Sequence, residues 1–229
     1  MKNKLNIIFC GYRTWAINVI NELKSHPRID NYIICENHKS LNLLNLENFN
    51  VLITVGLSDE LYDVCDNIET IGVHCAELDR YSYGTPIQLQ IIDGLDETKH
   101  RIFKFVNPGK EEVRAHTHTR EFSHEVSLSL GGTIENIFNN LTKTAITLFN
   151  KYLEDYPEIS WKKWPEEKLK KIARKPKDSN IELMLCLKEN FTTRSVYDFI
   201  RCLGKPYPNA FLEDEEGILK FKVVEYYTK

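Results

Sequence analysis

His74 stands in the stretch whose residue types are best suited to chemistry, IGVHCAELDRYSYGTPIQLQIIDG, which runs from Ile71 to Gly94. The histidine follows an apolar run and precedes an acidic, Tyr-rich loop that ends in Gly-Thr-Pro. An imidazole in such a place can move a proton near neutral pH or stabilise a developing oxyanion. A histidine that only packs in the core is the alternative, and this residue taken alone does not decide between them.

A second cluster of proton-transfer groups lies in RAHTHTREFSH, residues 114–124. His116 and His118 are two apart, so an extended chain places them on one face. No cysteine or carboxylate completes a recognisable ligand set, and we expect no metal. The histidines are instead candidates for proton transfer in a polar cleft. The residues that would line this cleft with them are Arg114, Arg120 and Glu121.

The first turn, CGYRTWA, contains a single glycine, Gly11, and therefore lacks the dinucleotide-binding fingerprint. Because the turn precedes a helix, whose amino end attracts negative charge, Tyr12 and Arg13 are candidates for contact with an anionic or nucleotide ligand. The alternative is that Tyr12 and Trp15 pack in the core. A nicotinamide oxidoreductase is the least favoured function, since the glycines are missing and no acid is placed for a ribose.

Apolar runs alternate with helical spacings along the first two thirds of the chain, which predicts a Rossmann-like α/β domain built on a parallel sheet. His74 then lies at the carboxyl end of a strand, where such sheets bind ligands. The runs that read as strands are KLNIIFCGY, NYIICEN, NVLITVGLS, ETIGVHCAEL, HRIFKFVN, SHEVSLSL and GILKFKVVEYY. The segments that read as helices are RTWAINVINELKSH, TPIQLQIIDG, GGTIENIFNNLTKTAITLFNKYL and RSVYDFIRCL.

A change to charge, Trp and Pro after the long helix marks a connection between domains. We expect a Rossmann-like catalytic domain over residues 1–155, and a linker with a small α+β domain over 156–229. GKPYPNAFL within the smaller domain reads as a Pro-rich turn.

Composition narrows the class of protein. The 229 residues are 42% hydrophobic and 28% charged, as in ordinary globular proteins. A net charge of −3 argues against a nucleic-acid partner. We find neither an apolar stretch long enough for a membrane span nor a signal-peptide core, and we expect a cytoplasmic protein. Six cysteines without C-x-x-C spacing predict reduced thiols.

Taken together, VLITVGLS, the His74 stretch and the tail RSVYDFIRCLGKPYPNAF resemble the formyltransferase family that uses 10-formyltetrahydrofolate. The order of parts is similar over nearly the whole chain, and the tail is the most specific piece. In its short length the chain is similar to the members of this family that formylate nucleotide-linked amino sugars. The resemblance implies that His74 stabilises the tetrahedral intermediate or relays a proton between the amine and the folate.

The chain departs from this family at two positions. The family has an Asn-x-His pair, and Gly72 stands where the asparagine is expected. The family's aspartate falls between His116 and Glu121, where this chain has none. Glu121, His116 or His118 could replace the base, and backbone N–H groups or Thr85 could replace the missing donor.

The resemblance also places the ligands. Folate would lie against the loop before the helix, at Tyr83, Gly84, Thr85 and Pro86. The sugar nucleotide would lie near the first turn, and the residues proposed for it are Gly11, Tyr12, Arg13 and Trp15, with Arg114 and Arg120 as further phosphate partners. Similar proteins form dimers through the small domain, and we expect a homodimer.

The leading hypothesis is an N-formyltransferase that acts on a nucleotide-linked amino-dideoxy sugar for a surface glycan such as lipopolysaccharide O-antigen. The alternative is a catalytically inactive relative that binds folate or a nucleotide sugar, as the two departures suggest. Formylation of methionyl-tRNA suits the fold but not the short tail or the acidic balance.

Overall fold

The computed structural model describes residues 3–56, 61–76, 81, 85–105, 121–163, 174–182, 191–205 and 207–229. The chain divides into two compact units, each made of several segments. Unit 1 contains Met1–His74, Lys99–Ser127 and Leu141–Glu166. Unit 2 contains Cys75–Thr98, Leu128–Asn140 and Glu167–Lys229. The proposed division at residue 155 stays a prediction.

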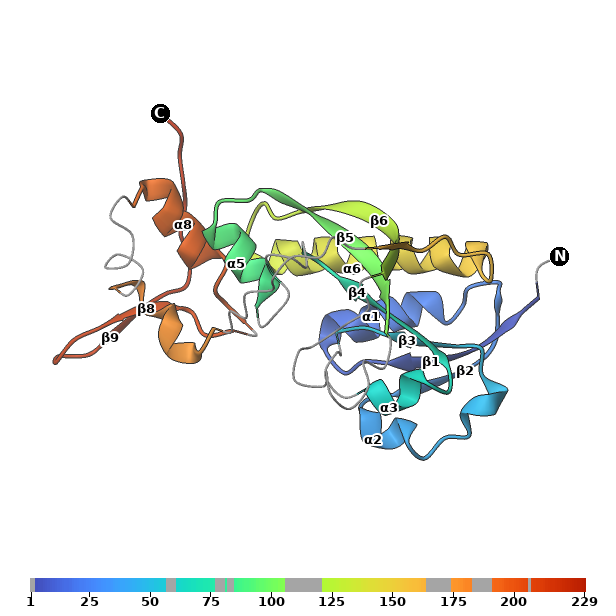
Figure 1. Ribbon diagram of the computed structural model, residues 1–229. Coiled ribbons are helices and arrows are strands. Elements are labelled where there is room, and N and C mark those ends of the chain that lie inside the picture. The colour runs from blue at the N-terminus through green and yellow to red at the C-terminus, as the bar shows by residue number, and fades with distance from the viewer. Residues whose placement is uncertain are drawn as a thin grey trace. The chain divides into compact units, whose positions relative to one another are not determined.

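A seven-stranded sheet forms the framework of unit 1, in the order β2-β1-β3-β4-β5-β6-β7 (Figure 1). Its first four strands in this order are parallel, as the alternating pattern predicted. The strands are β1 (Leu5–Cys10), β2 (Ile29–Cys35), β3 (Val51–Thr54), β4 (Glu69–His74), β5 (Glu97–Lys104), β6 (Glu121–Ser129) and β7 (Lys162–Lys163).

Strand β5 departs from the parallel pattern. It pairs antiparallel with β4, with His74 opposite Arg101 and Ile71 opposite Lys104. The chain therefore re-enters the sheet at the end of the strands where β4 stops, close to His74. A parallel return would have required a crossover to the opposite edge. The segment between the two strands belongs to unit 2.

One face of the sheet packs against two helices, α1 (Thr14–Leu23) and α6 (Ile134–Asp155). The alternation of side chains along each strand sends every second residue to this face. Tyr152 on α6 also donates a hydrogen bond of 2.8 Å to Glu69 at the start of β4. The core side chains are Leu5, Ile7, Phe9, Ala16, Val19, Ile20, Leu23, Val51, Ile53, Val55, Ile71, Ile102, Ala145, Leu148, Phe149, Tyr152 and Leu153.

The other short elements also follow local sequence signals. Pro86 occupies the first turn of α5 (Pro86–Ile92), and Gly94 adopts a φ of +86° just beyond its end, as a helix stop requires. Thr133 accepts from the Asn136 N–H and so caps α6, as predicted. The remaining helices that the structure describes are α2 (His38–Leu41), α3 (Tyr62–Cys65), α8 (Thr193–Arg201) and the 3-10 turns Leu46–Asn48 and Pro176–Ser179.

Unit 2 holds a β-hairpin in place of the turn predicted for GKPYPNAFL. Strand β8 (Ala210–Glu213) pairs antiparallel with β9 (Ile218–Phe221) (Figure 1). Residues 210–213 were predicted to be part of a turn because prolines precede them. They form a strand instead, because their apolar Ala-Phe-Leu sequence pairs with β9, which begins five residues after β8 ends. The predicted last strand is confirmed only over its first half.

The buried guanidinium of Arg201 ties α8 to the loop before α6 within unit 2. The Arg201 Nε atom donates to an Asp198 oxygen at 2.6 Å, and both side chains are buried. The same guanidinium donates through Nη1 to the Leu130 and Gly132 carbonyls at 2.6 and 2.9 Å. A planar fork with several donors suits such a buried site better than an ammonium group does.

We expect Arg201→Ala to lower the free energy of unfolding by about 3 kcal/mol, because it leaves the Asp198 Oδ1 atom and two carbonyls without their donor, while Arg194 still pairs with Oδ2. Arg201→Lys should fall between this variant and the native chain. The control is Lys4→Ala, which breaks an exposed pair with Asp30 and should cost less than about 1 kcal/mol. Urea unfolding measures all three, and equal losses for Arg201→Ala and Lys4→Ala would contradict the assignment.

Candidate functional site

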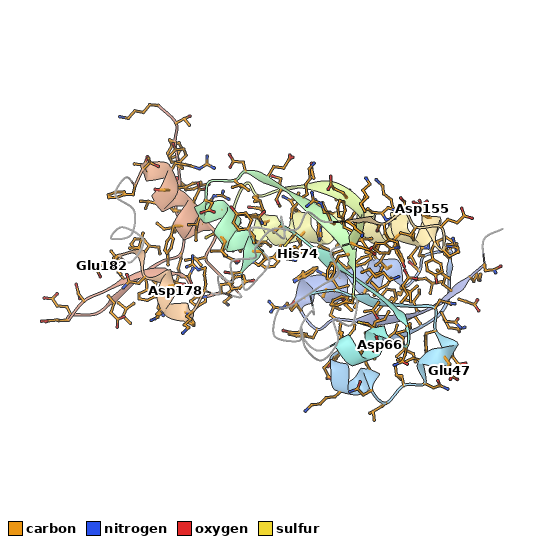
Figure 2. The ribbon with its side chains drawn as sticks, in the orientation of Figure 1. Glu47, Asp66, His74, Asp155, Asp178 and Glu182 are labelled. Atoms are coloured by element: carbon orange, nitrogen blue, oxygen red, sulfur yellow. The ribbon has the colours of Figure 1, made fainter. Side chains whose placement is uncertain are left out.

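His74 is the last residue of β4 and half-buried (Figure 2). Its ring lies edge-on to Phe103 on β5, with centroids 6.5 Å apart and planes at 89°. Ile71 and Val73 point to the core face, so His74 lies on the opposite face. Arg101 stands opposite His74 in the pairing and is neutralised by an ion pair with Glu125. Sequence reasoning missed Arg101, since its proximity depends on the antiparallel return of β5.

Gly72 shares the face of His74, two residues earlier on β4. A Cβ at this position would lie 2.7 Å from the Thr54 Oγ1 atom and 2.9 Å from the Phe103 ring. Thr54 pairs with Gly72 from β3, and Phe103 pairs with it from β5. A side chain such as asparagine therefore has no room at position 72 unless these neighbours move. The packing of Thr54 and Phe103 against Gly72 thus explains why this chain departs from the family's Asn-x-His pair.

His100 is buried on the core face of β5. Its Nδ1 atom lies 2.7 Å from the Thr144 Oγ1 atom, and the Thr144 hydroxyl donates to the Leu141 carbonyl at 3.1 Å. The hydroxyl proton is thus engaged, so Nδ1 carries the proton and donates. Burial, and secondarily the charge of His74, lower the pKa of His100 to about 3. His100 is therefore neutral at physiological pH.

The first turn separates its proposed ligand-binding residues into two groups. Tyr12 and Arg13 are exposed, and the Arg13 guanidinium lies over the Tyr12 ring at 5.6 Å. Trp15 is half-buried, packs on the core and lies 2.8 Å from where a Cβ of Gly56 would stand. Gly11 is required by packing, since its Cβ would meet the Val55 carbonyl at 2.8 Å. Tyr12 and Arg13 remain available to a ligand, whereas Trp15 serves the core.

Glu121 begins β6 and pairs with Lys163 on β7. Strand β5 lies between β4 and β6, so two strand spacings, about 10 Å, separate the backbones of β4 and β6. The other members of the RAHTHTREFSH cluster that were singled out, namely Arg114, His116, His118 and Arg120, lie outside the described residues. Tyr83 and Gly84 of the proposed folate loop also lie outside them.

Unit 2 contains a pair of buried polar side chains at the start of α5. The Thr85 hydroxyl and both polar atoms of the Gln88 amide are buried and have no hydrogen-bond partner among the described residues. Gln90, by contrast, donates to the Cys75 and Pro86 carbonyls. Sequence reasoning named Thr85 and Pro86 but missed Gln88. A polar residue between Ile87 and Ile91 on a short apolar helix was the available signal.

Within the described ranges, no group of three or more His, Cys, Asp or Glu side chains is arranged to hold a metal ion. Among the helices that the structure describes, none is long and apolar enough to cross a membrane. Cys10, Cys35, Cys65, Cys75 and Cys202 are free thiols.

Comparison with solved structures places this fold. A methionyl-tRNA formyltransferase from Clostridium thermocellum matches with a TM-score of 0.78 and 25% identity, over 97% of this chain and 94% of that chain. A 4-N formyltransferase from Francisella tularensis matches with a TM-score of 0.66 and 14% identity, over 97% and 99%. HypX from Aquifex aeolicus in complex with tetrahydrofolic acid matches with a TM-score of 0.69 and 12% identity, over 92% of this chain and 36% of that chain.

No family model and no curated protein matches the sequence. The chain nevertheless has the Rossmann-like fold of the formyltransferases, and the resemblance predicted from the sequence is confirmed in the fold. His74 ends β4, as the alternating pattern of the sequence predicted.

We expect Gly72→Ala to lower the free energy of unfolding by about 1–3 kcal/mol, because the new methyl group overpacks Thr54 and Phe103. Gly72→Ala combined with Phe103→Leu should recover part of the loss. Gly217→Ala is the control, since no atom lies within 4 Å of its Cβ, and it should change stability by less than about 0.5 kcal/mol. A loss at Gly217 as large as that at Gly72 would contradict the packing explanation.

The lowered pKa of His100 gives a pH dependence with a defined sign. In the unfolded chain His100 is protonated below about pH 6.5, whereas in the folded chain it is protonated only below about pH 3. The contribution of neutral His100 to the free energy of unfolding is therefore complete above pH 6.5 and decreases as the pH falls. We expect the native chain to lose about 2 kcal/mol more than His100→Asn between pH 7 and pH 5. Urea unfolding at both pH values measures this difference. Parallel losses in the two proteins would show that His100 does not titrate on unfolding.

Proposed function

We propose that this protein is an N-formyltransferase that moves a formyl group from 10-formyltetrahydrofolate to the amine of a nucleotide-linked amino-dideoxy sugar. The observation that carries the proposal is His74, which ends β4 of a formyltransferase fold on the face that α1 and α6 leave uncovered. The names of the compared structures specify 4-N formylation and formylation of methionyl-tRNA, and sugar N-formyltransferases are also among the solved structures that match this fold.

The reaction requires one bond to form and one to break. The amine nitrogen attacks the formyl carbon, which gives a tetrahedral intermediate with a negatively charged oxygen. The bond from this carbon to N10 of the folate then breaks, and the proton lost by the amine reaches N10. The products are a formamide and tetrahydrofolate. No electron is gained or lost, so the reaction needs no redox partner.

In this proposal His74 donates to the charged oxygen or relays the proton from the amine to N10. Glu121, His116 and His118 are the proposed bases in place of the family's aspartate. Glu121 begins β6 four residues before Glu125, the residue that pairs with Arg101 opposite His74, so its role as base also rests on the sequence. The proposal for the histidines rests on the sequence alone.

We propose that the folate is held by the loop and helix start of unit 2, through Tyr83, Gly84, Thr85 and Pro86. The unpartnered Thr85 hydroxyl and Gln88 amide support this assignment. An amide has both a donor and an acceptor, which matches the edge of a pterin ring. Burying such groups without a partner is unfavourable, so a ligand that satisfies them gains affinity.

For the sugar nucleotide we propose the exposed pair Tyr12 and Arg13 at the first turn. The guanidinium offers several donors to a pyrophosphate, and the ring offers a stacking face to a base. Gly11, which allows the close turn, and the half-buried Trp15 stay proposed contacts of the sugar nucleotide. Arg114 and Arg120 remain proposed phosphate partners on the basis of sequence.

The wider setting is also a proposal. The product would serve a surface glycan, such as an O-antigen, and the reaction would take place in the cytoplasm. A homodimer would form through the hairpin of β8 and β9, where Ile218 and Leu219 are 56% and 60% exposed. Apolar side chains on an exposed strand favour pairing with a second copy.

A catalytically inactive relative is the second candidate, and the closed packing around Gly72 is the observation that favours it. Such a protein would bind folate or a nucleotide sugar and transfer nothing. Binding without turnover is therefore the result that separates the two functions.

We expect the native chain to release tetrahydrofolate when given 10-formyltetrahydrofolate and a 3- or 4-amino-dideoxy sugar nucleotide. His74→Ala should lower kcat by at least about 100-fold, since a donor or acid-base group is lost. His26→Ala is the matched control, because this half-buried histidine precedes β2, the edge strand that β1 and β3 separate from β4, and should leave kcat unchanged. Absorbance of the released tetrahydrofolate measures turnover.

Methionyl-tRNA belongs in the same substrate panel. Turnover with methionyl-tRNA alone would keep the reaction and replace the sugar. Binding of folate with no turnover on any amine would favour the inactive relative instead.

A further inference from the structure

Thr54 ends β3 with a hydroxyl in an otherwise apolar strand, Val-Leu-Ile-Thr. The residue is 1% exposed, and its Oγ1 atom has no hydrogen-bond partner among the described residues. Thr54 pairs in register with Gly72, and Oγ1 lies 2.7 Å from the place that a Gly72 side chain would begin. The hydroxyl therefore stands beside the position that lacks the family's asparagine.

A hydroxyl buried in this way is unfavourable for folding. Valine has the same shape and would place a methyl group there without leaving a polar atom unsatisfied. This unfavourable burial of the Thr54 hydroxyl is explained if the hydroxyl forms a hydrogen bond only when a ligand is bound. Phe103, the neighbour of Gly72 from the other strand, carries no donor that could serve instead.

We propose that Thr54 is a catalytic hydrogen-bond donor that takes the place of the missing amide at Gly72. Its hydroxyl donates to the formyl oxygen as negative charge develops there, while His74 acts from the neighbouring strand. The threonine keeps its proton, and no bond to Thr54 forms or breaks. This assignment rests on the proposed formyl transfer and names a residue of that same site.

The sheet geometry permits two groups to meet at one oxygen. Adjacent strands lie about 4.8 Å apart and two residues along a strand span about 6.8 Å, so the Thr54 and His74 backbones are roughly 8 Å apart. Both side chains lie on the same face, because Thr54 pairs with Gly72 and His74 contacts Phe103. Two donors at hydrogen-bond distance from one oxygen fit within this separation.

Burial suits this role. The Thr54 Oγ1 and His74 Nε2 atoms are both shielded from solvent. A donor that is fixed in advance in a dry site stabilises an oxyanion more than one that water surrounds.

The test compares Thr54→Val, which removes the hydroxyl and keeps the shape, with Thr54→Ser, which keeps the hydroxyl. We expect Thr54→Val to lower kcat on the order of 100-fold with KM changed by less than about threefold, because the donor acts mainly in the transition state. Thr54→Ser should stay within about tenfold of the native kcat. The Tm of Thr54→Val should equal or exceed the native value, since an unsatisfied buried hydroxyl is gone.

Thr147→Val is the matched control, because the Thr147 hydroxyl is exposed and donates to the Lys143 carbonyl on α6. It should leave kcat unchanged. Turnover of Thr54→Val at the native rate would overturn the role of Thr54 and leave formyl transfer standing. A lower Tm together with equal losses of kcat in the Val and Ser variants would assign Thr54 to packing and also overturn the role.

Failure of the proposed function has a different signature. The native chain would then transfer no formyl group to any amine of the panel, while Thr54→Val and the native chain would bind tetrahydrofolate equally by calorimetry. That result overturns both proposals. Loss of turnover in Thr54→Val with native affinity for tetrahydrofolate, which lacks the formyl group, supports the donor.

Discussion

The pairing of β4 between β3 and β5 is the constraint on which the rest of the site depends. Ile71 and Val73 pack towards α1 and α6, so a shift of register by one residue would drive His74 into the core. The Tyr152 hydroxyl holds Glu69 at the other end of the strand. One strand therefore sets both the core and the position of the histidine, and neither can change without the other.

Much of this framework follows from the sequence because it depends on local signals. Apolar runs predicted β1 to β6 of the large sheet, whereas β7 lies in the segment read as a connection between domains. Pro86, Gly94 and Thr133 marked helix ends where the structure has them. The antiparallel direction of β5 was not predictable in this way. It depends on where the chain re-enters the sheet, and the intervening segment belongs to the other unit.

The residues of the candidate site likewise divide into those that local sequence signals predicted and those that only the strand pairing reveals. His74 was found from its place after an apolar run and from the family resemblance. Thr54 and Phe103 reach Gly72 from positions 18 and 31 residues away, and only strand pairing reveals them. The short apolar strand of Thr54 gave no hint that its last residue carries an unpartnered hydroxyl. Gln88 was hidden for a similar reason, since its burial depends on packing within unit 2.

The replacement of asparagine by glycine is best understood together with its neighbours. The Phe103 ring lies where the side chain of residue 72 would begin, so the loss of the amide and the presence of the ring belong to one packing solution. Such a change removes a donor from β4, and the adjoining positions on the same face are on β3 and β5. Phe103 cannot donate, whereas Thr54 can. Of the two residues that pair with Gly72, only Thr54 carries a donor, and this is why the proposal assigns the second donor to the hydroxyl of β3.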